Sequence, residues 1–333
     1  MTGSDHPGLV LAIDGGNSKT EVLLATGAGE VLTTGRGPGS SPHHLGVQGA
    51  VDLLDELVRK ALAQAGLDGA TVDRAEVYLA GVDFPNEKEV ATAAVSRRGW
   101  AREVTVDNDS FALLRAGTDS ADAVAVVCGA GINCVGVSRD GRHARFASLG
   151  RISGDWGGGM ELGDEALWWA ARADDGRGPA TALTSLVPAF FGLPDVPSVY
   201  EAIHFGRLEQ RRLIELAPTV LTASREGDPV CRGIVERLAD EVVAFARAAL
   251  TRLDMLDVPT AVVLGGGVLT SHDEVLLGEV RQRLAAAAPH AASVVTEVSP
   301  VVGAALLGLD HLGAPPSAGA ALRAALPLSG PAA

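Results

Sequence analysis

Three glycine-containing loops carry residue types that can bind phosphate. They span residues 14–20 (DGGNSKT), 128–134 (CGAGINC) and 264–268 (LGGGV), and each follows a short apolar run typical of a buried strand. Glycine lets the backbone approach a ligand closely, and backbone N–H groups can hold phosphate oxygens without a basic surface. The candidate nucleotide ligands are Gly15, Gly16, Asn17, Lys19, Thr20, Gly129, Ala130, Gly131, Asn133, Gly265, Gly266 and Gly267.

The first loop combines phosphate donors with a carboxylate. Residues from Asn17 to Thr20 offer N–H, hydroxyl and ammonium donors, and Asp14 offers a carboxylate that suits hydrated Mg²⁺. A Walker A loop is excluded, because Lys19 is preceded by Ser18 instead of glycine and a strand follows instead of a helix. Taken alone, the same residues also fit an ordinary hairpin turn.

The second and third loops suit other parts of a nucleotide. The second is not a dinucleotide fingerprint, because Cys134 stands where G-x-G-x-x-G requires its last glycine. In the third, the missing side chains would let a flat nucleoside lie against the backbone. Each loop alone is a weak signal, but the three in this order are specific.

Two carboxylates at the end of an apolar segment are candidates for a general base. Asp107 and Asp109 alternate in EVTVDND (103–109), so both side chains can point to one face of a strand. A carboxylate in this position can accept the proton of an attacking hydroxyl. Asp109 also fits a purely structural role, as the N-cap of the helix expected after it.

Residues 154–169 hold further candidates. Trp156 could present an aromatic face to a ring-shaped ligand or lie in the core, and Gly154 just before it is a further candidate substrate contact. Asp164 and Glu165 open an apolar segment that we expect to be helical, where acids in the first turn favour the helix dipole. Its two tryptophans, residues 168 and 169, are expected in the core.

Histidine and cysteine spacing favours no metal centre. His43 and His44 are neighbours, and two adjacent side chains rarely chelate one ion without further ligands. The three cysteines, Cys128, Cys134 and Cys231, match neither a disulfide framework nor a zinc spacing. They indicate reduced thiols in a cytoplasmic protein.

The elements that would position these residues occur twice. Residues 9–37 and 123–150 share the order strand, glycine-rich turn, strand, turn, strand. We expect a helix at 48–65, a strand at 76–81, a helix at 86–98 and a strand at 103–109, and later a long helical stripe and a buried strand at 260–266. The pattern predicts an α/β protein with two similar halves, and consecutive hairpins at the start of each half exclude a pure Rossmann order.

Composition limits the function further. The chain has 333 residues, 47% of them hydrophobic, and a net charge of −14. The length suggests two domains of about 150 residues each. The acidic balance argues against a nucleic-acid partner. No signal peptide is recognised at the start and no apolar run reaches about 18 residues, so we expect a cytoplasmic protein with no membrane partner.

These motifs together resemble the actin-like, hexokinase-like and Hsp70-like ATPase superfamily, and within it the N-acetylglucosamine kinases and BadF/BadG ATPases. The resemblance covers about residues 9–312. It includes D-G-G-x-x-K-T and G-x-G-x-N-C as phosphate loops, G-G-G as the adenosine contact, and W-G followed by G-D-E at 163–165. It also includes a P-V-V-G-A-A segment from Pro300, which is similar to the closing helix of that family.

The resemblance implies two duplicated ribonuclease-H-like domains around a central cleft, at 1–118 and 119–300, with a helix at about 301–313 that packs back on the first domain. Residues 314–333 are expected to form a loose tail. The resemblance further implies ATP held between the two phosphate loops, with Mg²⁺ oriented by Asp14 through water. We also expect a homodimer, for which the sequence offers no motif.

The implied reaction is transfer of the γ-phosphate to a sugar hydroxyl, with the C6 hydroxyl of N-acetylglucosamine or a related amino sugar as acceptor. The N-D pattern of the family selects Asp109 as the base, and its G-D-E segment selects Asp164 as a sugar ligand. The family uses the loop around His43 for acceptor contacts, usually through an asparagine, which Ser41-Pro42-His43 replaces here.

Three alternatives stay open at this point. The acceptor could be glucosamine or another hexose. The chain could be an ATPase activator of a radical dehydratase, although such activators carry a cysteine pair for a [4Fe–4S] cluster and no such pair is visible. A sugar sensor without turnover is disfavoured by the intact Asp14, Lys19 and Asp109.

Overall fold

The computed structural model describes residues 8–326, which divide into two compact units. Unit 1 comprises the described residues up to Ser120 and those from Thr296 onward, and unit 2 is Ala121–Val295. The chain therefore leaves unit 1, builds unit 2 and returns. Both divisions fall close to residues 118 and 300, where the sequence places them.

Unit 1 is built on a five-stranded sheet in the order β3-β2-β1-β4-β5. The strands are β1 (Leu9–Gly15), β2 (Lys19–Thr26), β3 (Val31–Pro38), β4 (Val72–Leu79) and β5 (Ala101–Asn108). The first three strands are joined by tight turns and pair antiparallel, whereas β1, β4 and β5 run parallel. The carboxyl ends of β1, β4 and β5 therefore meet at one edge of the sheet.

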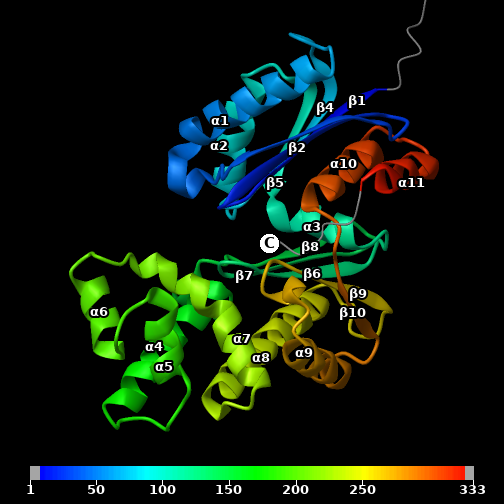
Figure 1. Ribbon diagram of the computed structural model, residues 1–333. Helices are drawn as coiled ribbons and strands as arrows, with labels where there is room; N and C mark the ends of the chain where they lie inside the picture. Colours follow the sequence, from blue (N-terminus) through cyan, green and yellow to red (C-terminus); the bar gives the residue numbers. More distant parts are fainter. Residues whose placement is uncertain (1–7, 327–333) are drawn as a thin grey trace, which may run out of the picture. The chain divides into compact units, whose positions relative to one another are not determined.

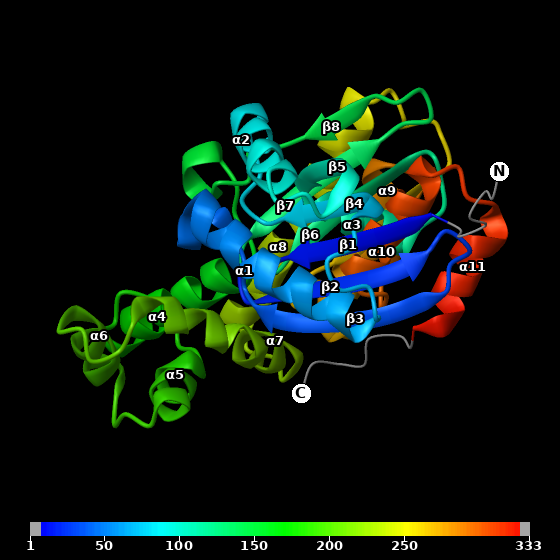
Figure 2. The same ribbon diagram turned by 90° about the horizontal axis from the view of Figure 1, so that it is seen from above.

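Helices cover both faces of this sheet, which explains why β1 is buried from Val10 to Gly15. The helices of unit 1 are α1 (Pro42–Gln64), α2 (Pro85–Ser96), α3 (Asp109–Gly117), α10 (Pro300–His311) and α11 (Pro316–Ala325). Figure 1 shows α1 and α2 on one face and α3 with α10 on the other, and Figure 2 shows α1 lying across β2 and β3. Leu54 and Val58 of α1 pack on Leu11 and Ile13 of β1 in this core.

Helix α1 begins earlier than the sequence predicts. Pro42 occupies its first turn, where a missing N–H does no harm. Gly46 then interrupts the helix with non-helical angles of φ 68° and ψ 162°. The amphipathic pattern from residue 48 onward therefore identifies only the part of α1 that follows the kink.

Unit 2 repeats the topology of unit 1, with the order β10-β9-β6-β7-β8. Its strands are β6 (Ala123–Cys128), β7 (Ile132–Val137), β8 (His143–Arg145), β9 (Thr260–Gly265) and β10 (Ala291–Val295). The pairs β6–β7 and β7–β8 are antiparallel, and β6–β9 and β9–β10 are parallel. The predicted duplicated α/β fold is confirmed by these two matching sheets.

The helices of unit 2 are α4 (Gly159–Asp174), α5 (Leu183–Phe191), α6 (Val196–His204), α7 (Ala217–Arg225), α8 (Pro229–Arg252) and α9 (Glu274–Ala287). Single turns of 3₁₀ helix occur at Gly150–Ser153 and Leu269–Ser271, and a longer 3₁₀ segment spans Gln210–Leu216. Helices α8 and α9 lie against the second sheet, while α4, α5 and α6 pack on one another as a separate helical group (green in Figure 1).

Two sequence predictions about elements are wrong. Residues 316–325 are not a loose tail but helix α11, in which Ala318 and Leu322 are buried; residues 327–333 lie outside the described part of the chain. Strand β10 was not predicted, because its residues alternate between exposed and half-buried positions instead of forming an apolar run. In residues 8–326 there is no helix long and apolar enough to cross a bilayer.

Candidate functional site

The first glycine loop is the tight turn between β1 and β2 in unit 1. The Gly16 N–H donates to the Lys19 carbonyl at 2.9 Å, and the Ser40 N–H donates to the Gly16 carbonyl at 3.1 Å. A Cβ at Gly15 would lie 2.4 Å from both Leu79 Cδ2 and Ser40 Oγ, so only glycine fits there. The turn leaves Asn17 exposed, where its groups can meet a ligand.

Two polar side chains of this loop have protein partners. Lys19 Nζ lies 2.7 Å from Glu21 Oε2, and the ammonium is part-exposed. Thr20 is fully buried, and its hydroxyl bonds the Pro38 carbonyl at 2.7 Å and Ser40 Oγ at 2.8 Å. The Thr20 side chain thus fixes the start of the segment after β3, and the assignment of Thr20 to the nucleotide stays a prediction.

Asp14, the last residue but one of β1, is a buried carboxyl group with 7% exposure. Burial, followed by the charges of Asp109 and Glu21, raises its pKa to about 8, and Lys19 opposes this effect. The carboxyl groups of Asp14, Asp109 and Glu21 thus interact, and the Lys19 ammonium partly compensates their negative charge. Carboxylate oxygens are the ligands that Mg²⁺ prefers, so this donor set fits the magnesium ion that the sequence predicts near Asp14.

Asp109 is the first residue of α3, directly after the carboxyl end of β5. The N-cap is not Asp109, as the structural alternative supposed, but Asn108, whose Oδ1 accepts the Ser110 N–H at 3.0 Å. Burial, then the charge of Asp83, raises the pKa of Asp109 to about 6, against the lowering effect of backbone N–H groups. A carboxylate with this pKa can take up a proton near neutral pH.

The competing candidate, Asp107, is neutralised by a neighbour. Lys88 Nζ of α2 donates to Asp107 Oδ2 at 2.6 Å, and the Asn108 N–H donates to Asp107 Oδ1 at 2.8 Å. Both oxygens of Asp107 are thus engaged by neighbouring protein groups. The geometry therefore favours Asp109 as the base, independently of any resemblance.

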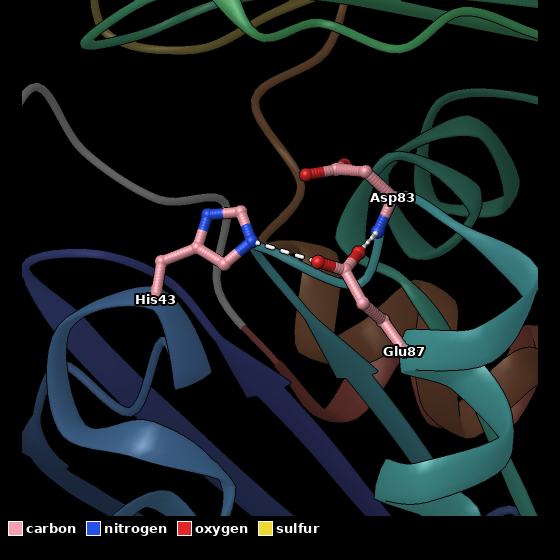
Figure 3. Close-up of side chains that lie close together, drawn as sticks. All are labelled: His43, Asp83 and Glu87. Atoms are coloured by element: carbon pink, nitrogen blue, oxygen red, sulfur yellow. Dashed lines mark hydrogen bonds and ion pairs between the residues drawn. The ribbon is translucent and has the colours of Figure 1, made fainter.

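Beside Asp109, three side chains from α1, the β4–α2 loop and α2 converge (Figure 3). His43 Nε2 lies 3.2 Å from Glu87 Oε1, and ligand atoms of His43, Asp83 and Glu87 all lie within 4.8 Å of one another. The other oxygen of Glu87 accepts the N–H groups of Asp83 and Phe84 at 2.8 and 2.9 Å. Asn108 Nδ2 holds Asp83 Oδ1 at 2.9 Å. This group could bind sugar hydroxyls or a cation, whereas His44 is no part of it.

In unit 2, three loops interlock at the carboxyl ends of β6 and β9. The Val268 N–H donates to the Cys128 carbonyl at 3.0 Å, and the N–H groups of Gly159 and Met160 donate to Gly129 and Ala130 at 2.8 and 3.0 Å. The second and third glycine loops are thereby held together, and the start of α4 is held to the second loop.

The glycines of these loops divide into two kinds. At Gly158 and Gly266, φ is +90° and +82°, and a Cβ would lie 2.5 Å from Ala130 O and Cys128 O, respectively. These two are required by packing. At Gly129, Gly131 and Gly267, a Cβ would meet nothing within 4 Å. These three border open space, as expected of residues whose backbone faces a ligand.

Asn133 lies on β7, next to the second loop. Its Oδ1 accepts the Cys134 N–H at 2.7 Å and the Ser148 hydroxyl. These two bonds fix the orientation of the Asn133 side-chain amide and therefore the direction in which its NH₂ group points. Ser148 has a φ of 53°, so it holds this bond from a left-handed backbone conformation.

The structure corrects the expectation for Trp156. Its side chain is 4% exposed, and the Arg237 guanidinium covers the ring at 4.0 Å from the centroid. The ring therefore belongs to the core and offers no free face to a sugar, although its buried Nε1 has no hydrogen-bond partner. Gly154, two residues earlier, has a φ of 85° and open space around it.

Asp164 does not begin a helix, as the sequence suggested. Helix α4 starts at Gly159, so Glu161 is the acid of the first turn and Asp164 lies in the second. Burial and then Glu161 raise the pKa of Asp164, while a hydrogen bond from Gln210 and the charge of Arg151 lower it. The expectation that Trp168 lies in the core is also wrong, because its side chain is 49% exposed and Arg172 lies over its ring.

The three cysteines are buried in the core of unit 2. Burial raises the pKa of the Cys128 and Cys231 thiols to about 12 and that of Cys134 still further. Buried, protonated thiols are poor metal ligands.

Sequence reasoning missed several residues of unit 1 that contact the predicted ones. Glu21 bonds Lys19 and is itself bonded by Ser299. Lys88 bonds Asp107, Glu87 bonds His43, and the charge of Asp83 acts on Asp109. Glu87 had a readable signal, because a proline at the first position and a glutamate at the third are typical of a helix start. The other contacts depend on packing between distant segments.

Comparison with known proteins identifies the family of the chain. Residues 11–308 match the model of the BadF/BadG/BcrA/BcrD ATPase family. An N-acetylmuramic acid/N-acetylglucosamine kinase of Clostridium acetobutylicum is 27% identical over 263 residues, or 79% of this chain and 86% of that protein. An N-acetyl-D-glucosamine kinase of Dictyostelium discoideum is 23% identical over 314 residues, or 91% and 98% of the two chains.

Among solved structures, the fold is similar to that of a candidate N-acetylglucosamine kinase of Chromobacterium violaceum. The TM-score is 0.72 at 24% identity, and the match covers 90% of this chain and 98% of that one. The resemblance drawn from the sequence motifs is confirmed by the family match.

Proposed function

Because this chain belongs to the BadF/BadG/BcrA/BcrD ATPase family, we propose that it is an ATP-dependent kinase for an amino sugar of the N-acetylglucosamine type. One observation in unit 1 carries the proposal. At the carboxyl edge of one sheet, Asp109 has a pKa of about 6 and interacts electrostatically with Asp14, which ends the strand before the Lys19 loop. A proton acceptor and a phosphate loop are thus combined in one unit.

In the proposed reaction, Asp109 accepts the proton of a sugar hydroxyl while that oxygen attacks the γ-phosphorus in line. A new bond forms between the sugar oxygen and phosphorus, and the bond to the β–γ bridging oxygen breaks. ADP leaves with the electron pair of that bond. The remaining work of the protein is to position the phosphates and to compensate their charge.

For the nucleotide, we assign the open glycines Gly129, Gly131 and Gly267 to backbone contacts, with Asn133 alongside. Lys19 and the N–H groups of the first loop then serve the terminal phosphates. Asp14 would hold Mg²⁺ through water. When bound, the ion would neutralise phosphate charge as the leaving group departs.

For the acceptor, we assign His43 and the adjacent Asp83 and Glu87 of unit 1. Asp164 and Gly154 of unit 2 keep the sugar role that the resemblance implies. Carboxylates and imidazole suit the hydroxyl groups of a sugar, because a carboxylate accepts their O–H groups and a neutral imidazole offers one donor and one acceptor nitrogen. Trp156 is left out of this assignment because its ring is covered. Phosphorylation at the C6 hydroxyl, a cytoplasmic location and a homodimer remain part of the proposal.

The activator of a radical dehydratase, a rival function within the same family, is not favoured by any observation. Such an activator needs accessible thiolates for an iron–sulfur cluster, whereas Cys128, Cys134 and Cys231 are buried. A colourless, active protein after aerobic purification is the expected result.

The test is ADP release in a coupled assay over a panel of sugars: N-acetylglucosamine, N-acetylmuramic acid, glucosamine, N-acetylmannosamine and glucose. We expect turnover with at least one N-acetylated amino sugar. The variant Asp109→Asn should lower kcat by about 10²–10⁴, the range attributed to a general base, while MgATP binding survives. Retained kcat in Asp109→Asn would refute the base, and no turnover with any sugar would refute the kinase.

A further inference from the structure

Glu21 of β2 connects the phosphate-loop lysine to a residue far away in the sequence. Its Oε2 atom lies 2.7 Å from Lys19 Nζ and also accepts the Ser299 hydroxyl at 2.7 Å. Lys19 and Glu21 are two residues apart on one strand, so their side chains lie on the same face of the sheet. All three residues belong to unit 1, and one oxygen atom serves both donors.

Ser299 occupies an unusual position for a serine that contacts a strand. It is the N-cap of α10, where a serine side chain ordinarily accepts an N–H from the first turn of its own helix. No such cap bond forms here, and the hydroxyl donates to Glu21 instead. The first turn of α10 thus gives up a capping bond, and Glu21 gains a second donor.

The position of Ser299 along the chain gives this contact its importance. Strand β10, the last element of unit 2, ends at Val295, and α10 of unit 1 begins at Pro300. Only residues 296–299 join them. This connecting segment therefore ends at Ser299, whose hydroxyl is hydrogen-bonded to Glu21, the partner of Lys19.

The charge state of Glu21 agrees with a held ion pair. Burial alone would raise its pKa, but the bonds from Lys19 and Ser299, together with the charge of Arg36, lower it below the usual value. Glu21 is thus a carboxylate at neutral pH, and charge-assisted bonds of this kind fix geometry well.

We propose that Glu21 and Ser299 are positioning residues for Lys19, so that the segment joining β10 to α10 sets the affinity of the phosphate loop for ATP. The proposal rests on the proposed function, because it requires ATP as the ligand. Glu21 holds the ammonium before the nucleotide arrives, which lowers the cost of ordering a flexible lysine when it meets the phosphates. Ser299 acts by keeping Glu21 in place.

The test is direct titration of the full-length protein with MgATP in the absence of sugar, by calorimetry. Ser299→Ala should weaken ATP binding by about three- to tenfold, the size expected for loss of one positioning bond. Ser299→Thr keeps the hydroxyl and should bind as the unaltered protein does. Ser96→Ala, at the exposed end of α2, is the matched control and should change nothing.

A purely structural role is separated by a double-mutant cycle. If Ser299 acts through Lys19, adding Ser299→Ala to Lys19→Ala should weaken ATP binding no further. Additive effects, or an unchanged Kd in Ser299→Ala alone, would overturn the inference and leave the proposed kinase standing. Failure of the unaltered protein to bind MgATP would overturn both.

Discussion

Asp109 and Asp107 illustrate how neighbours decide the chemistry of two similar residues. Both are aspartates at the end of β5, but Asp107 is paired with Lys88, whereas Asp109 is half-buried with Asp83 as a charged neighbour. An ammonium partner favours the charged carboxylate, and a carboxylate neighbour favours the protonated form. Burial and the charge of Asp83 thus raise the pKa of Asp109 toward the range that a general base needs.

The pKa of about 6 at Asp109 predicts the acid limb of the pH profile. The base must be ionised, so kcat/KM for the sugar should fall as the pH drops below about 6. Asp83→Asn removes the charge that raises this pKa while an amide oxygen can still accept from Asn108. The limb should then move to lower pH, as measured from initial rates between pH 4.5 and 8.

The control for this prediction is Asp68→Asn, which removes one exposed carboxylate from the same unit. Its pH profile should coincide with that of the unaltered protein. A limb that stays in place in Asp83→Asn would show that Asp83 does not set the pKa of the catalytic base.

Asp164 supports a second prediction at the residue scale. It lies half-buried on α4 beside Glu161 and Gln210, and we expect Asp164→Asn to raise the KM for the sugar by about tenfold, which corresponds to loss of one hydrogen bond to a charged group. The KM for ATP should change much less. Glu165→Gln is the control, because Glu165 contacts Arg237 instead. Equal shifts of both KM values in Asp164→Asn would exclude a sugar contact.

Whether a residue could be selected from the sequence depended on how far along the chain the residues that it contacts lie. Asp14, Lys19 and Asp109 could be selected as candidates from the sequence, because each lies within a short motif that carries its own chemical meaning. Asp83 and Ser299 could not, since their roles depend on contacts with Asn108 and Glu21 that only the folded chain creates. Trp156 was ambiguous for the same reason: burial by Arg237 is invisible in the sequence.

At the scale of elements, the loops of unit 2 act as one assembly. The second glycine loop accepts hydrogen bonds from the third loop and from the start of α4, so a change in one loop should disturb the others. Packing glycines and ligand-facing glycines then have different consequences when they are replaced. The sequence alone does not distinguish packing glycines from ligand-facing glycines.

Two alanine substitutions distinguish these classes. Gly158→Ala places a Cβ 2.5 Å from Ala130 O at a φ of +90°, so we expect a loss of stability of about 1–3 kcal/mol and weaker ATP binding. Gly131→Ala meets no protein atom within 4 Å, so stability should hold while the KM for ATP rises about tenfold. Thermal unfolding and ATP titration measure the two effects. A destabilised Gly131→Ala, or ATP affinity unchanged by it, would contradict the assignment of Gly131 to the ligand.

Prediction of the elements succeeded where hydrophobic patterns are strong. The two hairpin units, with the glycine turns between their strands, could be recognised because they repeat in order. Strand β10 and helix α11 were missed, because β10 alternates between exposed and half-buried positions and α11 lies in an alanine- and proline-rich segment. Helix α11 is nevertheless anchored, since Arg323 donates to the Ala116 carbonyl at 2.8 Å.

At the scale of the whole molecule, the duplication explains how an acidic protein can use an anionic substrate. The net charge is −14, yet each unit presents a glycine loop after the first strand of its sheet. Backbone N–H groups supply donors without net charge. Lys19, with Glu21 as its partner, is then the one charged phosphate ligand that we assign.

The return of the chain to unit 1 supports the last prediction. Helix α10 packs on α3 so closely that a Cβ at Gly303 would lie 1.8 Å from the Ala112 carbonyl oxygen. Gly303→Ala should therefore cost about 1–3 kcal/mol or more by overpacking, and it should do so in unit 1 alone. Hydrogen exchange read by mass spectrometry should show lost protection in β1, α3 and α10, with α8 unaffected.

Gly233→Ala, exposed on α8 with nothing within 4 Å, is the matched control and should stabilise its helix by about 0.5–1 kcal/mol. Equal loss of protection in both units would mean that they unfold together, and unchanged protection would mean that the contact between α10 and α3 can relax.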